Sequence, residues 1–261
     1  MRHTIGMRHL LWLWCVGCGF QHGMEGGDGT QTGSDAAAPD GRALDGRPGD
    51  ARPIDALDGP PPPVTFVQGA SGTFAGNTVT LTLSTAQHAG DLDIVALSWT
   101  TGTTVQSVTD SDNNTYALVA TTVSPGVGTL GVYYAENVAQ GVGADTITVK
   151  LSGSSNPVAV AAAYRGLATT DALDVEHSAY GTSTAPNSGN ATTTHAHDLL
   201  VGIPVSSVDV TAGTGFTTHV DANLDIVEDR EVTTTGGYSA TATLGSNAVW
   251  LATLAAFAAA S

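Results

Sequence analysis

Apolar and polar positions follow two different patterns along residues 64–261. Residues 79–83 and 146–151 alternate between apolar and polar, which is the period of a β-strand with one face covered. Residues 92–99 and 199–205 are almost continuously apolar, as is typical of strands covered on both faces. Turn-forming Gly, Asn, Asp and Ser separate these runs, and we find no helical stripe with caps. The pattern therefore predicts an all-β domain, built as a two-sheet sandwich.

Two local segments carry more specific expectations. Residues 109–116, TDSDNNTY, predict a hairpin in which an Asn or Asp adopts positive φ at the turn. Residues 248–260 are rich in Ala, which suits a helix. The Val, Leu and Trp residues placed among the alanines nevertheless favour a closing strand.

Three pairs of segments resemble one another in the same order along the chain. HAGDLDIVALS resembles HAHDLLVGIPVS, VYYAENV lines up with IVEDREV, and TITVKLSGSSNPVAVAAAY lines up with YSATATLGSNAVWLATLAAF. These segments occupy residues 88–98 and 195–206, 132–138 and 226–232, and 146–164 and 238–257. Because order and rough spacing are kept, the domain is predicted to consist of two related β halves packed together.

The beginning of the sequence has the layout of a secretory signal. Arg2 and Arg8 precede a short apolar run over residues 10–17, which is too short to span a bilayer that requires about 20 apolar residues. A charged start, an apolar run and a small residue before a processing site define a signal peptide. Cys15 and Cys18 are the only cysteines in the sequence, so the expected mature domain has no disulfide.

The run Val16-Gly17-Cys18 resembles the lipobox of bacterial lipoproteins. The resemblance implies cleavage after residue 17 and fatty acyl chains, such as palmitate, on Cys18. Cys15 departs from the Leu that is usual three positions before the acylated cysteine. Gly19 is not the Asp that retains such proteins in the inner membrane, so the resemblance implies export and lipid anchoring in the outer membrane. The alternative is an ordinary signal peptide cut elsewhere, which would give a free secreted protein.

Residues 18–63 separate the expected lipid-attachment position from the β domain. They hold seven of the eleven prolines and almost no large apolar residue. Such a composition cannot bury enough surface to offset the entropy lost on ordering, so we expect a disordered linker. The expected organisation is a signal peptide over residues 1–17, the linker over 18–63 and the β-sandwich over 64–261.

The expected β-sandwich is strongly acidic, with sixteen Asp and Glu residues against three Lys and Arg residues. This excess of negative charge repels phosphate backbones and excludes nucleic acid as a partner. It attracts divalent cations instead, so calcium is the one cofactor that the composition brings into consideration.

Asp110, Asp112 and Asn114 begin like the first half of a calcium-binding loop. Thr115 stands where an EF-hand requires Gly, and Thr121 stands where it requires Glu. An EF-hand is therefore excluded. The three residues remain candidate calcium ligands, with a plain hairpin as the competing interpretation.

His195 and His197 are two positions apart, a spacing that points both imidazoles to one side of a strand. Such a pair binds zinc or copper when further ligands arrive from elsewhere. The echoing segment keeps only one histidine, in His88-Ala89-Gly90. A turn that leads into a buried strand is therefore the competing interpretation.

Four residues are candidates for ligand binding. Tyr180 and Tyr238 lie beside glycines and are candidate surface rings for stacking on a sugar. Glu228 and Asp229 belong to an acidic run, in which strand alternation places them on opposite faces. The competing interpretation of this run is a solvated edge strand that its charge protects from aggregation.

The sequence contains no organised catalytic motif such as G-x-S-x-G, S-x-x-K or H-E-x-x-H. A triad is defined by geometry, and nothing in the sequence selects a scattered set such as Ser98, His219 and Asp229. Glu136 and Glu228 lie on echoing segments and form the least unfavourable pair for glycoside hydrolysis. No residue is therefore assigned a catalytic role.

The segments GDLDIVALSW, VTDSDNNTY, YYAENV, TTDALDV and HDLLVG together resemble a module that recurs in secreted bacterial surface proteins. The resemblance implies a β-sandwich of the jelly-roll or lectin-like kind with a surface role, and it supplies neither a ligand nor a catalytic residue. With the lipobox and the linker, it favours a non-enzymatic, lipid-anchored cell-surface protein for adhesion or ligand binding. Its expected partners are the membrane and an extracellular glycan or surface protein. The alternatives are a carbohydrate-binding module assisted by calcium and, after it, a polysaccharide hydrolase.

Overall fold

The computed structural model describes residues 62–125, 127–222 and 225–261, all of which belong to one compact unit, Ala56–Ser261. The expected signal peptide, the lipid-attachment position and nearly all of the linker lie outside these residues. The described residues form antiparallel strands and no helix. This arrangement confirms the all-β class and the packing of antiparallel sheets as a sandwich.

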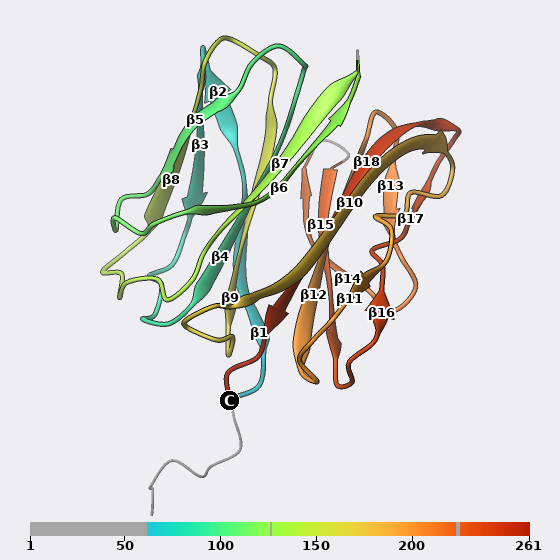
Figure 1. Cartoon of the computed structure of the whole chain (residues 1–261). Coiled ribbons are helices and arrows are strands. Elements are labelled where there is room, and N and C mark those ends of the chain that lie inside the picture. The colour runs from blue at the N-terminus through green and yellow to red at the C-terminus, as the bar shows by residue number, and fades with distance from the viewer. Residues whose placement is uncertain (1–61, 126, 223–224) are drawn as a thin grey trace, which may run out of the picture. The chain divides into compact units, whose positions relative to one another are not determined.

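The first half of the domain winds nine strands into two layers (Figure 1). The first inner sheet has the order β1-β9-β4-β7-β6, and the first outer sheet has the order β2-β3-β8-β5. The strands are β1 Thr65–Ser71, β2 Thr73–Ala75, β3 Thr78–Leu83, β4 Leu92–Trp99, β5 Val105–Thr109, β6 Ala117–Ser124, β7 Gly128–Ala135, β8 Asp145–Leu151 and β9 Val158–Arg165. β1 pairs with β9, β3 with β8 and β4 with β7. Such nested pairing is that of a rolled-up hairpin, as in a jelly roll.

The second half repeats this plan. The second inner sheet has the order β10-β18-β12-β15-β14, and two short pairs, β11-β16 and β13-β17, form the second outer layer. The strands are β10 Leu173–Ser183, β11 Ala191–Thr192, β12 Asp198–Ser206, β13 Val210–Ala212, β14 Thr217–Ala222, β15 Asp225–Val232, β16 Gly237–Tyr238, β17 Ala242–Leu244 and β18 Ala248–Ala258. The echoing segments fall on β4 and β12, on β7 and β15, and on β9 and β18, which hold equivalent places in the two inner sheets. The internal duplication is therefore confirmed.

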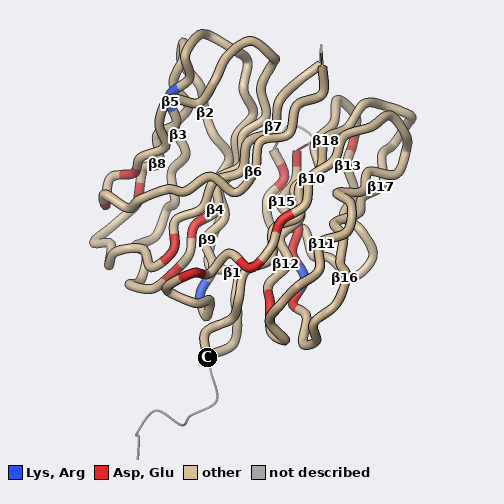
Figure 2. The backbone as a smooth tube through the Cα atoms, viewed as in Figure 1, with Lys and Arg blue, Asp and Glu red and all other residues tan. Residues whose placement is uncertain are grey.

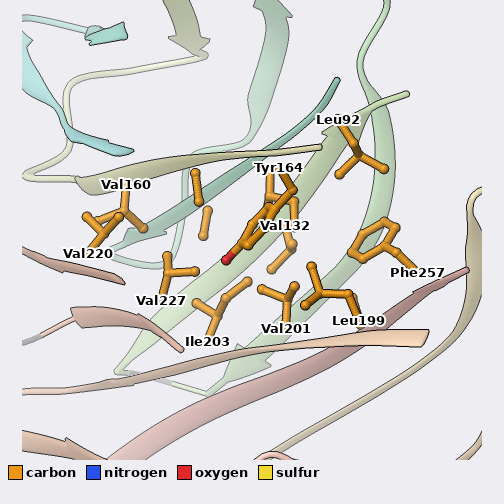
Figure 3. Packing of buried hydrophobic residues seen from close by; sticks show 14 of the residues in the cluster. Leu92, Val132, Val160, Tyr164, Leu199, Val201, Ile203, Val220, Val227 and Phe257 are labelled. Atoms are coloured by element: carbon orange, nitrogen blue, oxygen red, sulfur yellow. The ribbon is translucent and has the colours of Figure 1, made fainter. Parts of the chain in front are cut away.

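The two inner sheets pack face to face and enclose the largest hydrophobic cluster (Figure 3). Leu92, Val132 and Tyr164 of the first half meet Leu199 and Phe257 of the second half in this cluster. All five side chains are almost fully buried. Burial of this kind stabilises a fold by about 25 cal/mol for each Å² of apolar surface removed from water, so this cluster holds the halves together.

Each inner sheet is buried on its other face as well. β4 contributes Leu97 to a cluster that includes Leu81 of β3 in the first outer sheet. β12 contributes Leu200 to a cluster that includes Ala191 of β11 in the second outer layer. Burial on both faces explains why the runs that form β4 and β12 are almost continuously apolar, as predicted.

The halves meet in the manner of a two-fold symmetric dimer. β6 of the first half lies against β10 of the second, and β14 lies against β1. Because β14 is the equivalent of β6 and β10 is the equivalent of β1, the two contacts repeat each other. This exchange is the signature of an isologous interface, formed here within one chain.

The first and last described residues lie at the same end of the inner sheets (Figure 1). Thr65 at the start of β1 pairs with Arg165 at the end of β9, and Asp198 at the start of β12 pairs with Ala258 at the end of β18. We call this end the base. The opposite end, where β4 and β12 finish at Trp99 and Ser206, is the far end.

Residues 109–116 do not form the expected hairpin. β5 belongs to the first outer sheet and β6 to the first inner sheet, so the segment between them crosses from one layer to the other. Asn113 does adopt positive φ, at 63°. The positive φ at the turn is therefore confirmed, but turn residues do not encode which sheet the next strand joins. The expected closing strand is confirmed as β18.

Candidate functional site

Acidic residues gather around the base and along the second inner sheet (Figure 2). Two groups among the described residues bring three metal-type ligands together, each with one ligand atom within 4.8 Å of the other two. A cleft lies apart from both groups, at the far end. These three places are the candidates for function.

The first group consists of Asp93, Asp110 and Asp145. Asp93 lies on β4, Asp110 directly follows β5, and Asp145 begins β8. The group therefore joins the first inner sheet to the first outer sheet. Asp93 and Asp145 are fully buried, and Asp110 is partly buried.

Neutral donors hold these three carboxylates. Nε2 of Gln87 donates to Asp93 at 3.0 Å and to Asp145 at 3.1 Å, and the Tyr116 hydroxyl lies 3.2 Å from both Asp93 and Asp110. Burial raises the pKa of Asp93 to about 7, and the neighbouring carboxylates add to the rise. Oδ1 of Asp93 and Oε1 of Gln87 are buried without a hydrogen-bond partner among the described residues.

Only one of the three expected calcium ligands joins this group. Asp110 belongs to it, whereas Asn114 donates from its backbone N and from Nδ2 to Asp110, at 2.9 and 2.7 Å. Asp112 lies outside the group, although burial and the charges of Asp145 and Asp110 raise its pKa. Sequence reasoning missed Asp93 and Asp145. An acidic residue inside an apolar strand, as in Leu92-Asp93-Ile94, is the signal that could have found the first of them, because a buried charge needs a partner.

The second group consists of Asp174, His195 and Asp198. Asp174 lies on β10, Asp198 begins β12, and His195 stands in the segment before it. Nδ1 of His195 lies 3.2 Å from Oδ1 of Asp174, and the backbone N of Thr194 donates to Oδ2 of Asp174 at 2.7 Å. The two carboxylates come from β10 and β12, the strands on either side of β18 in the second inner sheet, and they meet at the base.

Asp198 has an unusual environment. It is fully buried, and neither of its carboxylate oxygens has a hydrogen-bond partner among the described residues. Burial raises its pKa to about 6, and the charge of Asp174 contributes to the rise. A buried charged group without partners is rare in native proteins and calls for an explanation.

The structure places only one of the two histidines in this group. Both precede β12, so the strand alternation that would pair their rings does not apply to them. His195 belongs to the group with the two aspartates, and His197 does not. The backbone O of His197 accepts a hydrogen bond from the N of Ala259 at 2.9 Å, which ties this segment to β18.

The far-end cleft opens where the two inner sheets end, with a volume of about 410 Å³. Hydroxyl-bearing Ser98, Thr100 and Ser206 line it together with apolar Val249. Oγ of Ser98 donates to Oδ2 of Asp225 at 2.6 Å, and burial raises the pKa of Asp225 to about 7. The cleft thus offers hydroxyl groups over an apolar floor, with a protonatable carboxyl at its side.

His219 and Asp229 are in contact, with Nε2 of His219 2.9 Å from Oδ2 of Asp229. Ser98, the third member of the scattered set named above, hydrogen-bonds Asp225 instead. The His219 ring is stacked on Phe66 of the other half. The structure therefore joins two of the three residues, in the seam between the halves.

The four candidate ligand-binding residues do not converge. Tyr180 is half exposed on β10, while the hydroxyl of Tyr238 donates to the backbone O of Thr234 at 2.8 Å. Glu228 is fully buried and accepts a hydrogen bond from the N of Gly213 at 2.8 Å. Asp229 faces His219 on the opposite side of β15, as alternation predicts.

The interpretation of the acidic run as a solvated edge strand is wrong. β15 pairs with β12 on one side and with β14 on the other, and Glu228 is fully buried. Glu136, which forms with Glu228 the candidate pair for glycoside hydrolysis, accepts a hydrogen bond from the N of Ala172 at 2.8 Å. Each of these two glutamates therefore holds a backbone N–H of the scaffold.

Comparisons with models of protein families, with curated proteins and with solved structures found no match. Within the described residues, no helix is long and apolar enough to cross a membrane.

Proposed function

We propose that this protein is a non-enzymatic, lipid-anchored binding module of the bacterial cell surface. The proposal is carried by the positions of the linker junction and the cleft, which lie at opposite ends of the domain. The linker joins the domain at the base, next to Val64, and the cleft lies at the far end, beside Ser98 and Ser206. A domain tethered at its base presents the far end to the surroundings of the cell.

The anchoring part of the proposal is supported by the sequence. Cys18 stands where bacterial lipoproteins carry their acyl chains, and the Pro-rich residues 18–63 separate it from the first strand. Acyl chains contribute about 0.8 kcal/mol for each CH₂ buried in the bilayer, and more than one chain gives durable anchoring. The 46 residues from Cys18 to Pro63 would reach roughly 35–40 Å as a flexible chain.

The binding part is supported by the contacts of the polar groups. Glu136 and Glu228 hold backbone N–H groups, and His219 is packed against Phe66. The cleft combines hydroxyl groups with apolar Val249 and Leu251, a combination that suits a ligand with both hydroxyl groups and apolar faces. A glycan is such a ligand, and the proposed module binds a glycan in this cleft.

Membrane fractionation tests the anchoring. Cys18→Ser should move the protein from the membrane fraction to the soluble fraction, because the acylated sulfur is lost. Cys15→Ser is the matched control and should stay with the membrane. Membrane association that survives Cys18→Ser contradicts lipid anchoring.

A glycan array tests the binding. Ser207 is exposed and lines the cleft, so Ser207→Trp should fill the opening and reduce glycan binding at least tenfold. Thr73→Trp, at an exposed position on β2, is the control and should bind like the parent chain. Glycan binding that is equal in the two variants places the ligand elsewhere, and no binding by the parent chain contradicts a glycan partner.

A calcium-assisted carbohydrate-binding module is the second candidate. Asp93, Asp110 and Asp145 offer only oxygen ligands, which calcium prefers. Oε1 of nearby Gln87 has no hydrogen-bond partner among the described residues and is a further oxygen ligand. This candidate predicts that a chelator abolishes glycan binding and that added calcium restores it. Glycan binding that is insensitive to the chelator excludes this candidate and leaves the first proposal standing.

A further inference from the structure

Because the domain is duplicated, the second acidic group, Asp174, His195 and Asp198, can be compared with the equivalent residues of the first half. Asp91 precedes Leu92, which pairs with Tyr164, and Asp198 precedes Leu199, which pairs with Phe257. Asp91 and Asp198 therefore hold equivalent positions at the base of the two inner sheets, and both are fully buried.

The first half neutralises its buried aspartate with a cation from the chain. Nε and Nη2 of Arg165 donate to the two oxygens of Asp91 at 2.7 and 2.8 Å, and the backbone N of His88 adds a third hydrogen bond at 2.9 Å. The equivalent of Arg165 in the second half is Ala258, which is the β18 partner of Asp198. The second half therefore lacks the guanidinium that balances the charge of the aspartate in the first half.

The second half has also gained a negative charge at the same place. A β-bulge interrupts the register between Phe66 and Gln68 on β1, and another interrupts it between Leu173 and Val175 on β10. The bulged residue is Val67 in the first half and Asp174 in the second. A bulge redirects a side chain, and here it brings a second carboxylate close to Asp198.

These exchanges change the net charge of the base. Asp91, Arg165 and His88 in the first half correspond to Asp198, Ala258 and His195 in the second, and Asp174 adds a second aspartate there. Two neighbouring carboxylates with little access to water destabilise each other unless a cation lies between them. Among the described residues, no Arg or Lys forms an ion pair with Asp174 or Asp198, and neither carboxylate oxygen of Asp198 has a hydrogen-bond partner.

We propose that Asp174, His195 and Asp198 bind a divalent metal ion of the zinc class in place of the arginine that the first half uses. An imidazole nitrogen beside two carboxylate oxygens suits zinc better than calcium or magnesium, which prefer oxygen ligands alone. The side chain of His195 is 55% exposed, so the ion is reached from solvent and keeps a position open for water or a ligand group. This inference does not depend on the function proposed above.

A proton shared between Asp174 and Asp198 is the competing explanation. It would also relieve the repulsion, but it requires no histidine and no metal. The two explanations differ in what removal of the imidazole does: it weakens the binding of a metal ion, but it leaves a shared proton in place.

Calorimetric titration of the purified, chelator-treated full chain with zinc chloride tests the proposal. The expected result is one high-affinity zinc ion for each chain and a higher melting temperature with zinc than without it. His195→Ala should weaken zinc binding at least tenfold and leave the circular dichroism spectrum unchanged, because the side chain is exposed. His88→Ala changes the equivalent histidine of the first half and should bind zinc like the parent chain.

Two further variants test the comparison between the halves. Asp198→Asn removes a ligand and should abolish zinc binding. Ala258→Arg restores the arginine of the first half and should abolish zinc binding while the chain stays folded. The proposal is overturned if the parent chain takes up no zinc, or if His195→Ala and Ala258→Arg bind zinc as tightly as the parent chain.

Discussion

The ring of Phe66 on β1 stacks on the imidazole of His219 on β14, with centroids 4.0 Å apart and planes inclined by 15°. Tyr164 meets Phe66 edge-on at 5.7 Å. These rings come from both halves of the domain, and β1 and β14 form one of its two equivalent edge contacts. The stack therefore fixes how the two inner sheets are placed against each other.

Truncation of this stack should destabilise the whole domain. Phe66→Ala removes a partly buried ring and leaves a cavity at the seam, so we expect the free energy of unfolding to fall by about 2–4 kcal/mol. Urea unfolding followed by circular dichroism measures the change. Phe74 on β2 is half exposed, and Phe74→Ala should cost less than about 1 kcal/mol. Equal losses in the two variants would contradict a structural role of the stack.

Gly69 allows the two halves to approach closely at the same seam. A Cβ atom placed on Gly69 would lie 2.4 Å from Cγ2 of Val220 on β14 and 3.1 Å from the O of Ala161. Gly69→Ala should therefore force the inner sheets apart and lower the free energy of unfolding by about 1–3 kcal/mol. Gly143 has no atom within 4 Å of its Cβ position, so Gly143→Ala is the matched control. A melting temperature that falls as much for Gly143→Ala as for Gly69→Ala would refute this account.

The strands of the inner sheets could be predicted from sequence because double burial leaves a local trace. The run that forms β4 is apolar at nearly every position, and β18 contains Val, Leu and Trp among its alanines. These side chains fill both faces of a sheet, so an Ala-rich segment forms a strand and not a helix. Tertiary packing here outweighs the helix propensity of Ala.

The candidate sites could not be predicted because they depend on pairing across long separations. Asp110 is a candidate ligand from its own loop, but it meets Asp145 only because β5, which it follows, pairs with β8, which Asp145 begins. Asp174 has no local sequence signal, since its position on a bulge beside Asp198 follows from the register of β10 against β18. Local turn residues do not specify that register.

Stability should decrease as the pH rises from about 5 to 8. Burial raises the pKa of Asp225 from 3.8 to about 7 and that of Glu228 from 4.5 to about 7. Between these values the folded chain binds more protons than the unfolded chain, so the free energy of unfolding falls with increasing pH. One pKa unit corresponds to about 1.4 kcal/mol, and we expect a melting temperature several degrees lower at pH 8 than at pH 5.

Amide variants identify the groups responsible for this pH dependence. Asp225→Asn with Glu228→Gln replaces both carboxyl groups by neutral isosteres, so the difference in melting temperature between pH 5 and pH 8 should shrink. Asp209 is exposed, and Asp209→Asn should leave the difference unchanged. An undiminished pH dependence in the double variant would show that other groups cause it.

The pair of Arg165 and Asp91 makes the stability of the first half depend on one guanidinium. Asp91 is fully buried, whereas 39% of the Arg165 side chain is exposed, so removal of the arginine leaves a buried carboxylate without its cation. Arg165→Ala should lower the free energy of unfolding by about 2–4 kcal/mol, somewhat less than for a fully buried pair because water reaches the arginine. Chemical denaturation at pH 7 measures the loss.

Lys150 is exposed, and among the described residues it forms no ion pair. As the control, Lys150→Ala should therefore change the free energy of unfolding by less than about 0.5 kcal/mol. The double variant Arg165→Ala with Asp91→Asn should recover part of the lost free energy of unfolding, because the carboxylate that needs the cation is then absent. A double variant no more stable than Arg165→Ala would show that the arginine acts through packing alone.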